Sequence, residues 1–86
     1  MKFTDEDFNI IGNIAPETAG GIGVINILDD CGNMATVDTI VEKSGERRYR
    51  IQAIINALCK LGYAKTELVE NNGIIKRKVY LLKSYK

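Results

Sequence analysis

The chain has 86 residues, of which 45% are hydrophobic and 27% charged, and its formal net charge is +1. These values are ordinary for a single soluble domain, and the length allows only one small core. No run approaches eighteen consecutive apolar residues, and the acidic N-terminus MKFTDEDF lacks the apolar stretch of a signal peptide. We therefore expect a cytoplasmic protein with no membrane-spanning segment.

The side chains that most enzymes use are scarce in this sequence. There is no histidine, the usual general base near neutral pH, and Cys31 and Cys59 cannot by themselves complete a four-ligand zinc site. In a reducing compartment the two cysteines are expected to be part-buried core residues rather than a disulfide. No serine lies in a G-x-S-x-G context, and no paired carboxylates stand out. We therefore expect no enzymatic activity, no catalytic residues, no metal and no cofactor.

The charge is divided unevenly along the chain. Residues 1–44 carry two basic and eight acidic side chains, a net charge of −6, whereas residues 45–86 carry ten basic and three acidic side chains, a net charge of +7. This division indicates a basic surface on the C-terminal half and an acidic partner for it. Attraction between the two halves within the fold is the alternative.

The first predicted element is a short helix that begins after Thr4. Thr4 can cap the helix, and the acids of residues 5–7 suit its first turn. A possible apolar face, interrupted between residues 12 and 15, consists of Phe8, Ile10, Ile11 and Ile14.

A glycine-rich segment follows. Pro16-Glu17 suits a second helix start, but Gly20, Gly21 and Gly23 each cost about 1 kcal/mol inside a helix. The segment could therefore be a flexible joint, with the helix proper beginning near Ile22. A phosphate-binding loop is a weaker alternative, because G-x-G-x-x-G is not completed and no Walker lysine follows.

Residues 22–28 are apolar nearly all round, the pattern of a helix that is buried on several sides or shared with a second subunit. Gly32 can supply its left-handed C-terminal cap. Asn33-Met34-Ala35 is then interpreted as a short connector. Thr36 is a fair N-cap for a short amphipathic helix, which carries Val37, Ile40 and Val41 at helical spacing and ends at Ser44-Gly45.

The next helix, which is the third when residues 22–28 are counted as the first, is predicted over about residues 46–61, within SGERRYRIQAIINALCKLGY. Gly62 supplies its stop. Its apolar face consists of Ile51, Ile54, Ile55, Leu58 and Leu61. The opposite stripe consists of Tyr49, Ala53, Asn56 and Lys60, with Arg50 and Gln52 on the shoulders. Glu46 is the only acid in this helix, whereas a purely solvated face more often mixes Glu with Lys.

Beyond Gly62 the pattern changes to that of strands. Residues 64–70 and 74–82 flank Asn71-Asn72-Gly73, a strong hairpin signal. A two-residue turn at Asn72-Gly73 and a three-residue turn with Gly73 in a bulge are both possible, and they place opposite side chains on the inner face. The second strand carries Lys76, Arg77 and Lys78, which could also protect an edge strand from pairing.

The order of these elements resembles the winged helix-turn-helix domain of prokaryotic transcription regulators of the MarR and ArsR kind. The matching positions are Ile40-Val41, Gly45, Ile51, Ile54-Ile55, Leu58, Leu61-Gly62-Tyr63 and Val79-Tyr80-Leu81. The resemblance implies an α+β, mainly α, fold with a three-helix core and a C-terminal β-hairpin wing. It implies a single domain over residues 1–86, with 22–83 as the winged-helix core and 1–21 as a short N-terminal helical extension.

In such regulators the third helix enters the major groove of DNA and the wing contacts the backbone or the minor groove. Carried over to this chain, phosphate contacts fall to Arg47, Arg48, Arg50 and Lys60, and base edges to Tyr49, Gln52, Ala53 and Asn56. The resemblance also implies that Lys76, Arg77 and Lys78 hold the wing against phosphates. Neutralising six or more phosphates makes affinity fall on the order of 10³-fold from 50 to 200 mM salt.

The sequence also departs from that class of regulators. Many of its members dimerise through a long C-terminal helix, which this chain lacks, so a homodimer would form through residues 1–30. No small-molecule ligand site is evident. The competing hypothesis is a winged-helix protein–protein interaction module in a larger assembly, with an acidic protein on the basic half. The near-absence of acids on the third helix favours double-stranded DNA as the partner.

Overall fold

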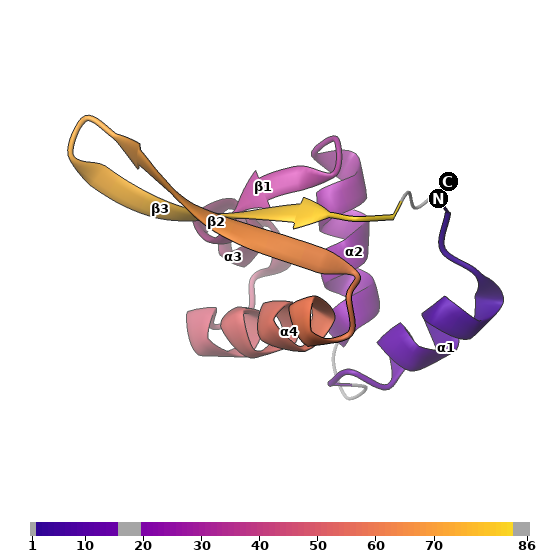
Figure 1. The fold of residues 1–86 in the computed structure, drawn as a ribbon. Coiled ribbons are helices and arrows are strands. Elements are labelled where there is room, and N and C mark those ends of the chain that lie inside the picture. Colours follow the sequence, from indigo (N-terminus) through magenta and orange to yellow (C-terminus); the bar gives the residue numbers. More distant parts are fainter. Residues whose placement is uncertain (1, 16–19, 84–86) are drawn as a thin grey trace.

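The computed structural model describes residues 2–15 and 20–83 and has an α+β fold (Figure 1). Within these residues the helices are α1 (Asp5–Gly12), α2 (Gly20–Asp30), α3 (Val37–Ser44) and α4 (Arg48–Lys60). The strands β1 (Met34–Thr36), β2 (Ala64–Asn71) and β3 (Ile74–Leu81) form an antiparallel sheet in the order β1-β3-β2. The helix start expected at Pro16-Glu17 lies outside the described residues.

The capping residue predicted for α1 is confirmed. The Asp7 amide donates to Thr4 Oγ1 (3.1 Å), and the Thr4 amide donates to Asp7 Oδ2 (2.9 Å), which makes a reciprocal capping box. Of the predicted apolar face, Ile11 is fully buried and Phe8 and Ile14 are partly buried, but Ile10 remains 38% exposed. The helix therefore buries a narrower face than the sequence indicates.

The sequence leaves open whether the glycines at 20, 21 and 23 form a joint or part of a helix, and the structure shows the helix, because α2 begins at Gly20 rather than near Ile22. A Cβ atom on Gly21 would lie only 2.7 Å from the Ile11 carbonyl oxygen and 2.9 Å from Ile11 Cγ2. Gly20 has φ +54°, and a Cβ there would lie 2.3 Å from the Ile14 carbonyl oxygen. Glycine thus lets the first turn of α2 lie directly on the end of α1, a close approach that offsets its low helix propensity.

The connector predicted at Asn33-Met34-Ala35 is wrong, since β1 occupies most of it. Met34 pairs with Tyr80, Ala35 with Val79 and Thr36 with Lys78. Three residues are too short to show the alternation of a strand, so only the pairing with β3, which lies more than forty residues later in the chain, defines β1.

The register of the β2–β3 hairpin settles the choice between the two predicted turns. Asn71 pairs with Ile74, and both turn residues have positive φ, 54° at Asn72 and 79° at Gly73. This is the two-residue turn whose twist matches that of the flanking strands. Val79 is fully buried and therefore lies on the inner face of the sheet. Because side chains alternate along a strand, Ile75 and Arg77 lie on this inner face, whereas Lys76 and Lys78 lie on the outer face.

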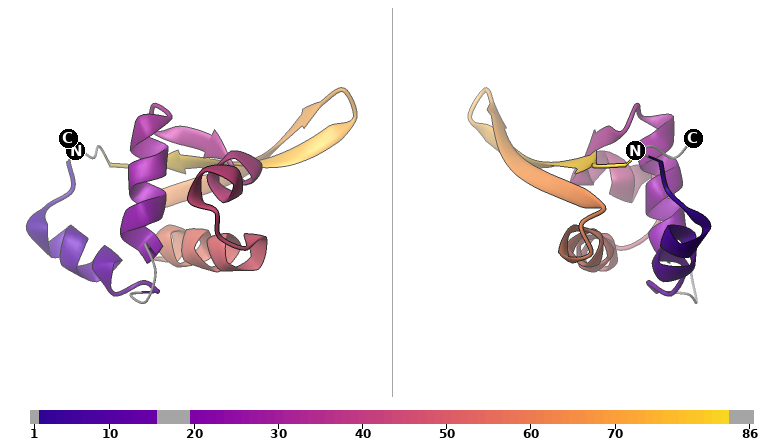
Figure 2. Two further views of the ribbon diagram at one scale, coloured as in Figure 1. Left: turned by 180° about the vertical axis from the view of Figure 1, so that it is seen from behind. Right: turned by 45° about the vertical axis from the view of Figure 1, so that its right-hand side comes forward.

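Helices α2, α3 and α4 pack against one another, and the sheet covers one side of them while the β2–β3 hairpin projects beyond the helices (Figures 1 and 2). The apolar face of α4 is buried as predicted at Ile51, Ile54, Ile55 and Leu58. Leu61, predicted to belong to it, is 47% exposed because α4 ends at Lys60 and the chain turns away at the C-cap. Within the described residues no helix has the length and apolar character needed to cross a bilayer.

Asp7 fastens the N-terminal segment to this core. Its carboxylate accepts hydrogen bonds from the Tyr63 hydroxyl (2.8 Å) and from Lys83 Nζ (2.9 Å), and the ring of Phe3 packs 5.6 Å from that of Tyr63. The Thr4 amide and Lys83 hold the pKa of Asp7 far below its usual range. Burial, followed by the hydrogen bond to Asp7, raises the pKa of Tyr63. Residues 2–15 are therefore part of the same packed unit as α2–α4.

Candidate nucleic-acid interface

The segment from α3 to α4 is shaped by two local caps. Thr36 Oγ1 accepts from the Thr39 amide (3.2 Å) and begins α3, and Gly45 ends it in the left-handed conformation (φ +69°). Three residues, 45–47, then join the two helices. Arg47 is the N-cap of α4, so this helix begins two residues later than predicted.

The stripe predicted to face outward on α4 lies on its exposed side. Tyr49 is 64% exposed, and Ala53, Asn56 and Lys60 are also exposed. Gln52 is half-buried beside them. The stripe therefore presents an aromatic ring, a methyl group, an amide and an amine to whatever lies against α4.

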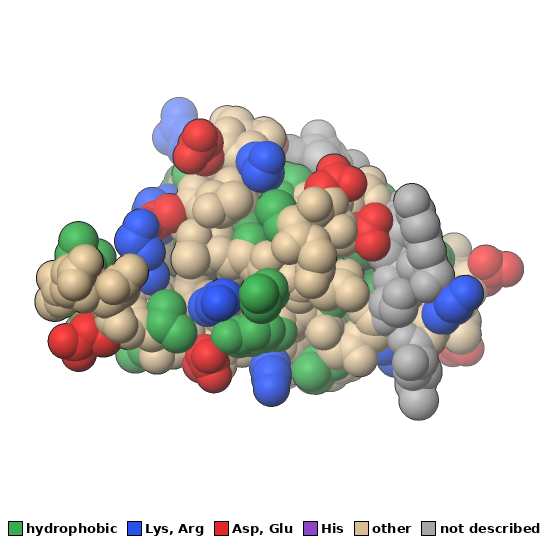
Figure 3. Space-filling model, turned by 90° about the horizontal axis from the view of Figure 1, so that it is seen from above, with side chains coloured by type: hydrophobic (Ala, Val, Ile, Leu, Met, Phe, Trp, Pro, Cys, Tyr) green, Lys and Arg blue, Asp and Glu red, His purple; other side chains and the backbone are tan. Residues whose placement is uncertain are grey.

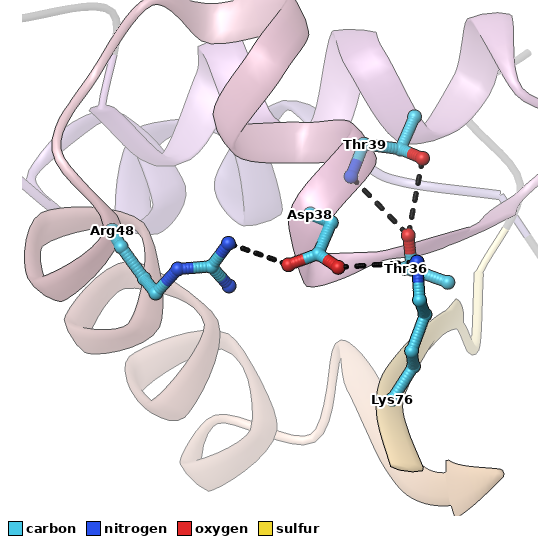
Figure 4. A network of polar contacts seen from close by, with 5 residues as sticks. All are labelled: Thr36, Asp38, Thr39, Arg48 and Lys76. Atoms are coloured by element: carbon cyan, nitrogen blue, oxygen red, sulfur yellow. Dashed lines mark hydrogen bonds and ion pairs between the residues drawn. The ribbon is translucent and has the colours of Figure 1, made fainter. Parts of the chain in front are cut away.

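Asp38, in the first turn of α3, joins α4 to the hairpin (Figure 4). Its Oδ1 atom lies 2.5 Å from Arg48 Nη2, and its Oδ2 atom lies 3.3 Å from Lys76 Nζ. The hydrogen bond from Arg48, and then that from Lys76, lower the pKa of Asp38, so the carboxylate is ionised at neutral pH. One acid thus holds two of the predicted phosphate-binding cations in one place, and it reduces the positive charge they present.

A second contact links the same two elements. Arg77 Nη2, on the inner face of β3, donates to Asn56 Oδ1 on α4 (2.8 Å). Since Asn56 belongs to the outward stripe, the basic part of β3 lies beside that stripe. Together with the Asp38 cluster, this contact makes the exposed side of α4 and the hairpin one continuous surface.

The groove between α4 and the hairpin has a volume of about 340 Å³. Arg48 and Gln52 line it from α4, Val37 and Asp38 from α3, and Leu68, Ile75, Lys76 and Arg77 from the hairpin. Its walls thus carry cations on both sides with Asp38 between them, and they are partly aliphatic at the hairpin. On the other flank of α4, the loop after α1 contributes Ile14 and Ala15 to a second hollow beside Tyr49 and Ala53.

Two of the predicted residues, Arg50 and Lys78, are less available at this surface than the others. Arg50 is half-buried, and its Nε atom lies 3.7 Å from Oε2 of Glu46, four residues earlier in the chain. Lys78 belongs to the outer face of the hairpin, 5.7 Å from the ring centre of Tyr80. Tyr80 donates to Glu67 (2.7 Å), and this hydrogen bond is the first cause of its raised pKa.

Two further charged residues, Lys65 and Asp38, make contacts that the sequence pattern does not indicate. Lys65 lies 5.4 Å from the ring centre of Tyr80, in the same outer cluster as Lys78. Asp38 was visible only as an acid in a helix first turn, because its two cations come from distant parts of the chain. Only the fold shows that this acid lies inside the basic surface.

Compared with protein-family models, the chain matches none, and no curated protein matches it significantly. Among residues 2–15 and 20–83 there is no group of three or more His, Cys, Asp or Glu side chains placed to hold a metal ion. Both cysteines are free and partly buried. A functional assignment therefore depends on the geometry of the α4–hairpin surface.

Proposed function

We propose that this chain is a winged helix-turn-helix domain that binds double-stranded DNA in a sequence-specific way, as a small transcriptional regulator. In this assignment α3 and α4 are the helix-turn-helix, β2 and β3 are the wing, and the residues before α2 are an N-terminal extension. The observation that carries the proposal is the Arg77–Asn56 hydrogen bond, because it sets the basic strand beside the exposed stripe of α4.

The proposed docking places α4 in the major groove and the wing on the backbone. Gln52 and Asn56 carry amides that can pair two-fold with adenine, and Ala53 leaves room for a thymine methyl group. Arg77 donates to one lone pair of the Asn56 carbonyl oxygen, so the second lone pair and the amino group remain available for a two-fold pair with a base.

Phosphate contacts in this docking come from both ends of α4 and from the wing. Arg47 is exposed at the start of the helix and Lys60 at its end, and Arg48 and Lys76 lie between α4 and the wing. These contacts position the protein, whereas the amides specify the sequence.

A fluorescence anisotropy titration with mixed-sequence duplex DNA at 50 and 200 mM salt tests the proposal. Wild-type protein is expected to bind at 50 mM, and Arg47→Glu and Arg77→Glu are each expected to weaken binding by roughly tenfold or more. Lys2→Glu makes the same charge change on an exposed residue of the N-terminal segment and serves as the matched control. Absence of binding at 50 mM, or equal effects of all three changes, contradicts the proposal.

Cytoplasmic location, absence of enzymatic activity and a homodimer through residues 1–30 belong to the same proposal. In the described part of that segment the monomer itself buries Phe3, Ile11, Val24, Ile25 and Leu28, whereas Phe8, Ile14, Ile22 and Ile27 are only partly buried. Ile10, 38% exposed on α1, is the side chain best placed for such a contact. Light scattering of wild-type protein and of Ile10→Glu tests the dimer, and a wild-type monomer refutes it.

The alternative function is a winged-helix protein–protein interaction module. One observation favours it: Leu68 and Ile75 line the groove with exposed aliphatic surface, which phosphate contacts do not need. An acidic protein would bind in this groove whether or not nucleic acid is present. Binding of duplex DNA that is weakened by Arg47→Glu and by Arg77→Glu separates the two functions in favour of DNA.

A further inference from the structure

The outer edge of β2 has no neighbouring strand. The strand order is β1-β3-β2, so among residues 2–15 and 20–83 the sheet ends at β2. β2 has eight residues, more than the mean strand of about 5–6. Toward the turn, the hairpin end (residues 68–77) projects away from the helices in both views of Figure 2. Such an edge presents a row of unpaired N–H and C=O groups, with which another strand can pair.

The hairpin turn decides which backbone groups lie on this edge. Asn71 and Ile74 close the two-residue turn, so these two residues bond to each other. The N–H and C=O groups of an antiparallel strand point alternately to its two sides. On the other side of the hairpin, the Leu81 amide donates to the Asn33 carbonyl oxygen (2.9 Å), away from β2, as this alternation requires. The residues of β2 whose backbone groups point to the free edge are therefore Thr66, Leu68 and Glu70.

Aliphatic side chains are exposed beside the same edge. Leu68 is 73% exposed, the largest value among the large hydrophobic side chains of the described residues. Ile75, its diagonal neighbour on the inner face of the sheet, is 64% exposed. Seen from above, hydrophobic side chains reach the surface at the hairpin end (Figure 3). An unpaired edge with exposed aliphatic side chains indicates a binding surface.

We propose that β2 of a second copy of this chain pairs with this edge, antiparallel and about a two-fold axis at Leu68. Leu68 then faces Leu68 of the second copy, and Ile75 of each copy lies diagonal to that pair. The aliphatic side chains of the two hairpins thus cover one another. Thr66 pairs with Glu70 of the second copy, and the two sheets become one continuous sheet. Such a contact is isologous, because each copy offers the same surface to the other.

The charges on β2 agree with this register. Lys65 faces Asn71 of the second copy and Glu67 faces Val69, so no like charges lie directly opposite each other. A two-fold axis at Glu67 or at Glu70 would instead set two acids opposite each other. The charged residues, which commonly protect an edge strand, therefore disfavour those two registers and leave the one centred on Leu68 open.

Sedimentation equilibrium of the full chain, at concentrations up to about 1 mM, measures the association without any DNA. Wild-type protein is expected to approach twice the monomer mass. Leu68→Lys is expected to weaken association at least about tenfold, because two facing cations replace two covered leucines. Met34→Lys is the matched control, since it makes the same charge change at another exposed apolar residue, on β1 at the other edge of the sheet. It is expected to leave association unchanged.

Cysteine substitutions determine the register. Hydrogen-bonded residues in an antiparallel pair have Cα atoms about 5.5 Å apart, which suits a disulfide. Leu68→Cys alone is expected to give a covalent dimer on mild oxidation. Thr66→Cys and Glu70→Cys are each expected to give none alone and to crosslink when the two variants are mixed. Wild-type protein, which has free Cys31 and Cys59, measures the background.

Three results would overturn the proposal. The first is a wild-type monomer at every concentration. The second is a dimer that Ile10→Glu dissociates and Leu68→Lys leaves intact, because that dimer forms through residues 1–30. The third is crosslinking by Thr66→Cys alone, which centres the pairing two residues earlier. None of these results bears on DNA binding, since no measurement contains DNA. Circular dichroism of each variant checks that the fold is retained.

Discussion

Asp38 offers the sharpest test of the proposed DNA surface, because it is the acid that two of the surface cations share. Asp38→Asn removes one negative charge and keeps a side chain of the same shape, which can still accept a hydrogen bond from Arg48. Apart from Lys78, which belongs to the outer face of the hairpin, the surface has six basic residues, which are Arg47, Arg48, Arg50, Lys60, Lys76 and Arg77. Its two acids, Asp38 and Glu46, leave a net charge of +4 in the wild-type protein and +5 in the variant.

If each net positive charge neutralises one phosphate, the slope of log K against log salt is about −3.6 for the wild-type protein and about −4.5 for Asp38→Asn. The first value corresponds to a loss of affinity of about 150-fold between 50 and 200 mM salt. If the two lines meet near 1 M salt, the variant binds about 15-fold more tightly at 50 mM. Removing an acid is thus expected to strengthen binding, and to strengthen it most at low salt.

Anisotropy titrations at four salt concentrations measure both slopes. Asp30→Asn is the matched control, because it makes the same charge change at the exposed end of α2. It is expected to leave the slope unchanged. Weaker binding by Asp38→Asn, an unchanged slope, or an equal gain in the control would refute the reasoning, since each places Asp38 outside the surface that meets phosphate.

Further predictions concern stability. Gly21→Ala is expected to destabilise the fold by about 1–2 kcal/mol, because the new Cβ would lie 2.7 Å from the Ile11 carbonyl oxygen; Gly12→Ala, with open space around it, should be neutral or stabilising in the same urea titration. Tyr63→Phe removes a hydrogen bond to an ionised carboxylate and should cost about 1–2 kcal/mol in urea, and an unchanged midpoint would contradict the contact. The pKa of Asp7 is lower in the folded state than its usual value of about 3.9, so the stabilisation is complete above that value and is lost as the pH falls below it. Thermal melts between pH 6 and 2.5 should therefore show a smaller loss of stability for Asp7→Asn than for wild-type protein, and parallel curves would rule this linkage out.

The sequence predicted most where the determining chemistry is local. Thr4, Thr36 and Gly45 act on the residues next to them, so the starts of α1 and α3 and the end of α3 were foreseeable. The period of Ile51, Ile54, Ile55 and Leu58 likewise predicted the buried face of α4. The hairpin followed from Asn72-Gly73, although its register needed the structure.

Features that depend on distant residues were missed. β1 exists because β3 pairs with it, and the helical glycines of α2 are explained by the end of α1 beneath them. Asp38 lies in the first turn of α3, and its partners come from α4 and β3, which no local pattern reveals. Leu61 was assigned to the core because periodicity does not reveal that the helix ends one residue earlier. The residues of the candidate site were thus predictable in kind and exposure, whereas the contacts that join them were not.

The Asp7 cluster has a consequence for how the chain opens. Asp7 binds the Thr4 amide and Lys83 at once, and the Leu82 amide donates to the Tyr63 carbonyl oxygen (2.9 Å) beside them. The two ends of the described chain therefore share one carboxylate and cannot fray independently. Hydrogen exchange at Thr4 and Leu82 should rise together when either end is loosened. The first segment and the last thus form one cooperative unit, on the side of the molecule opposite the hairpin end (Figure 1).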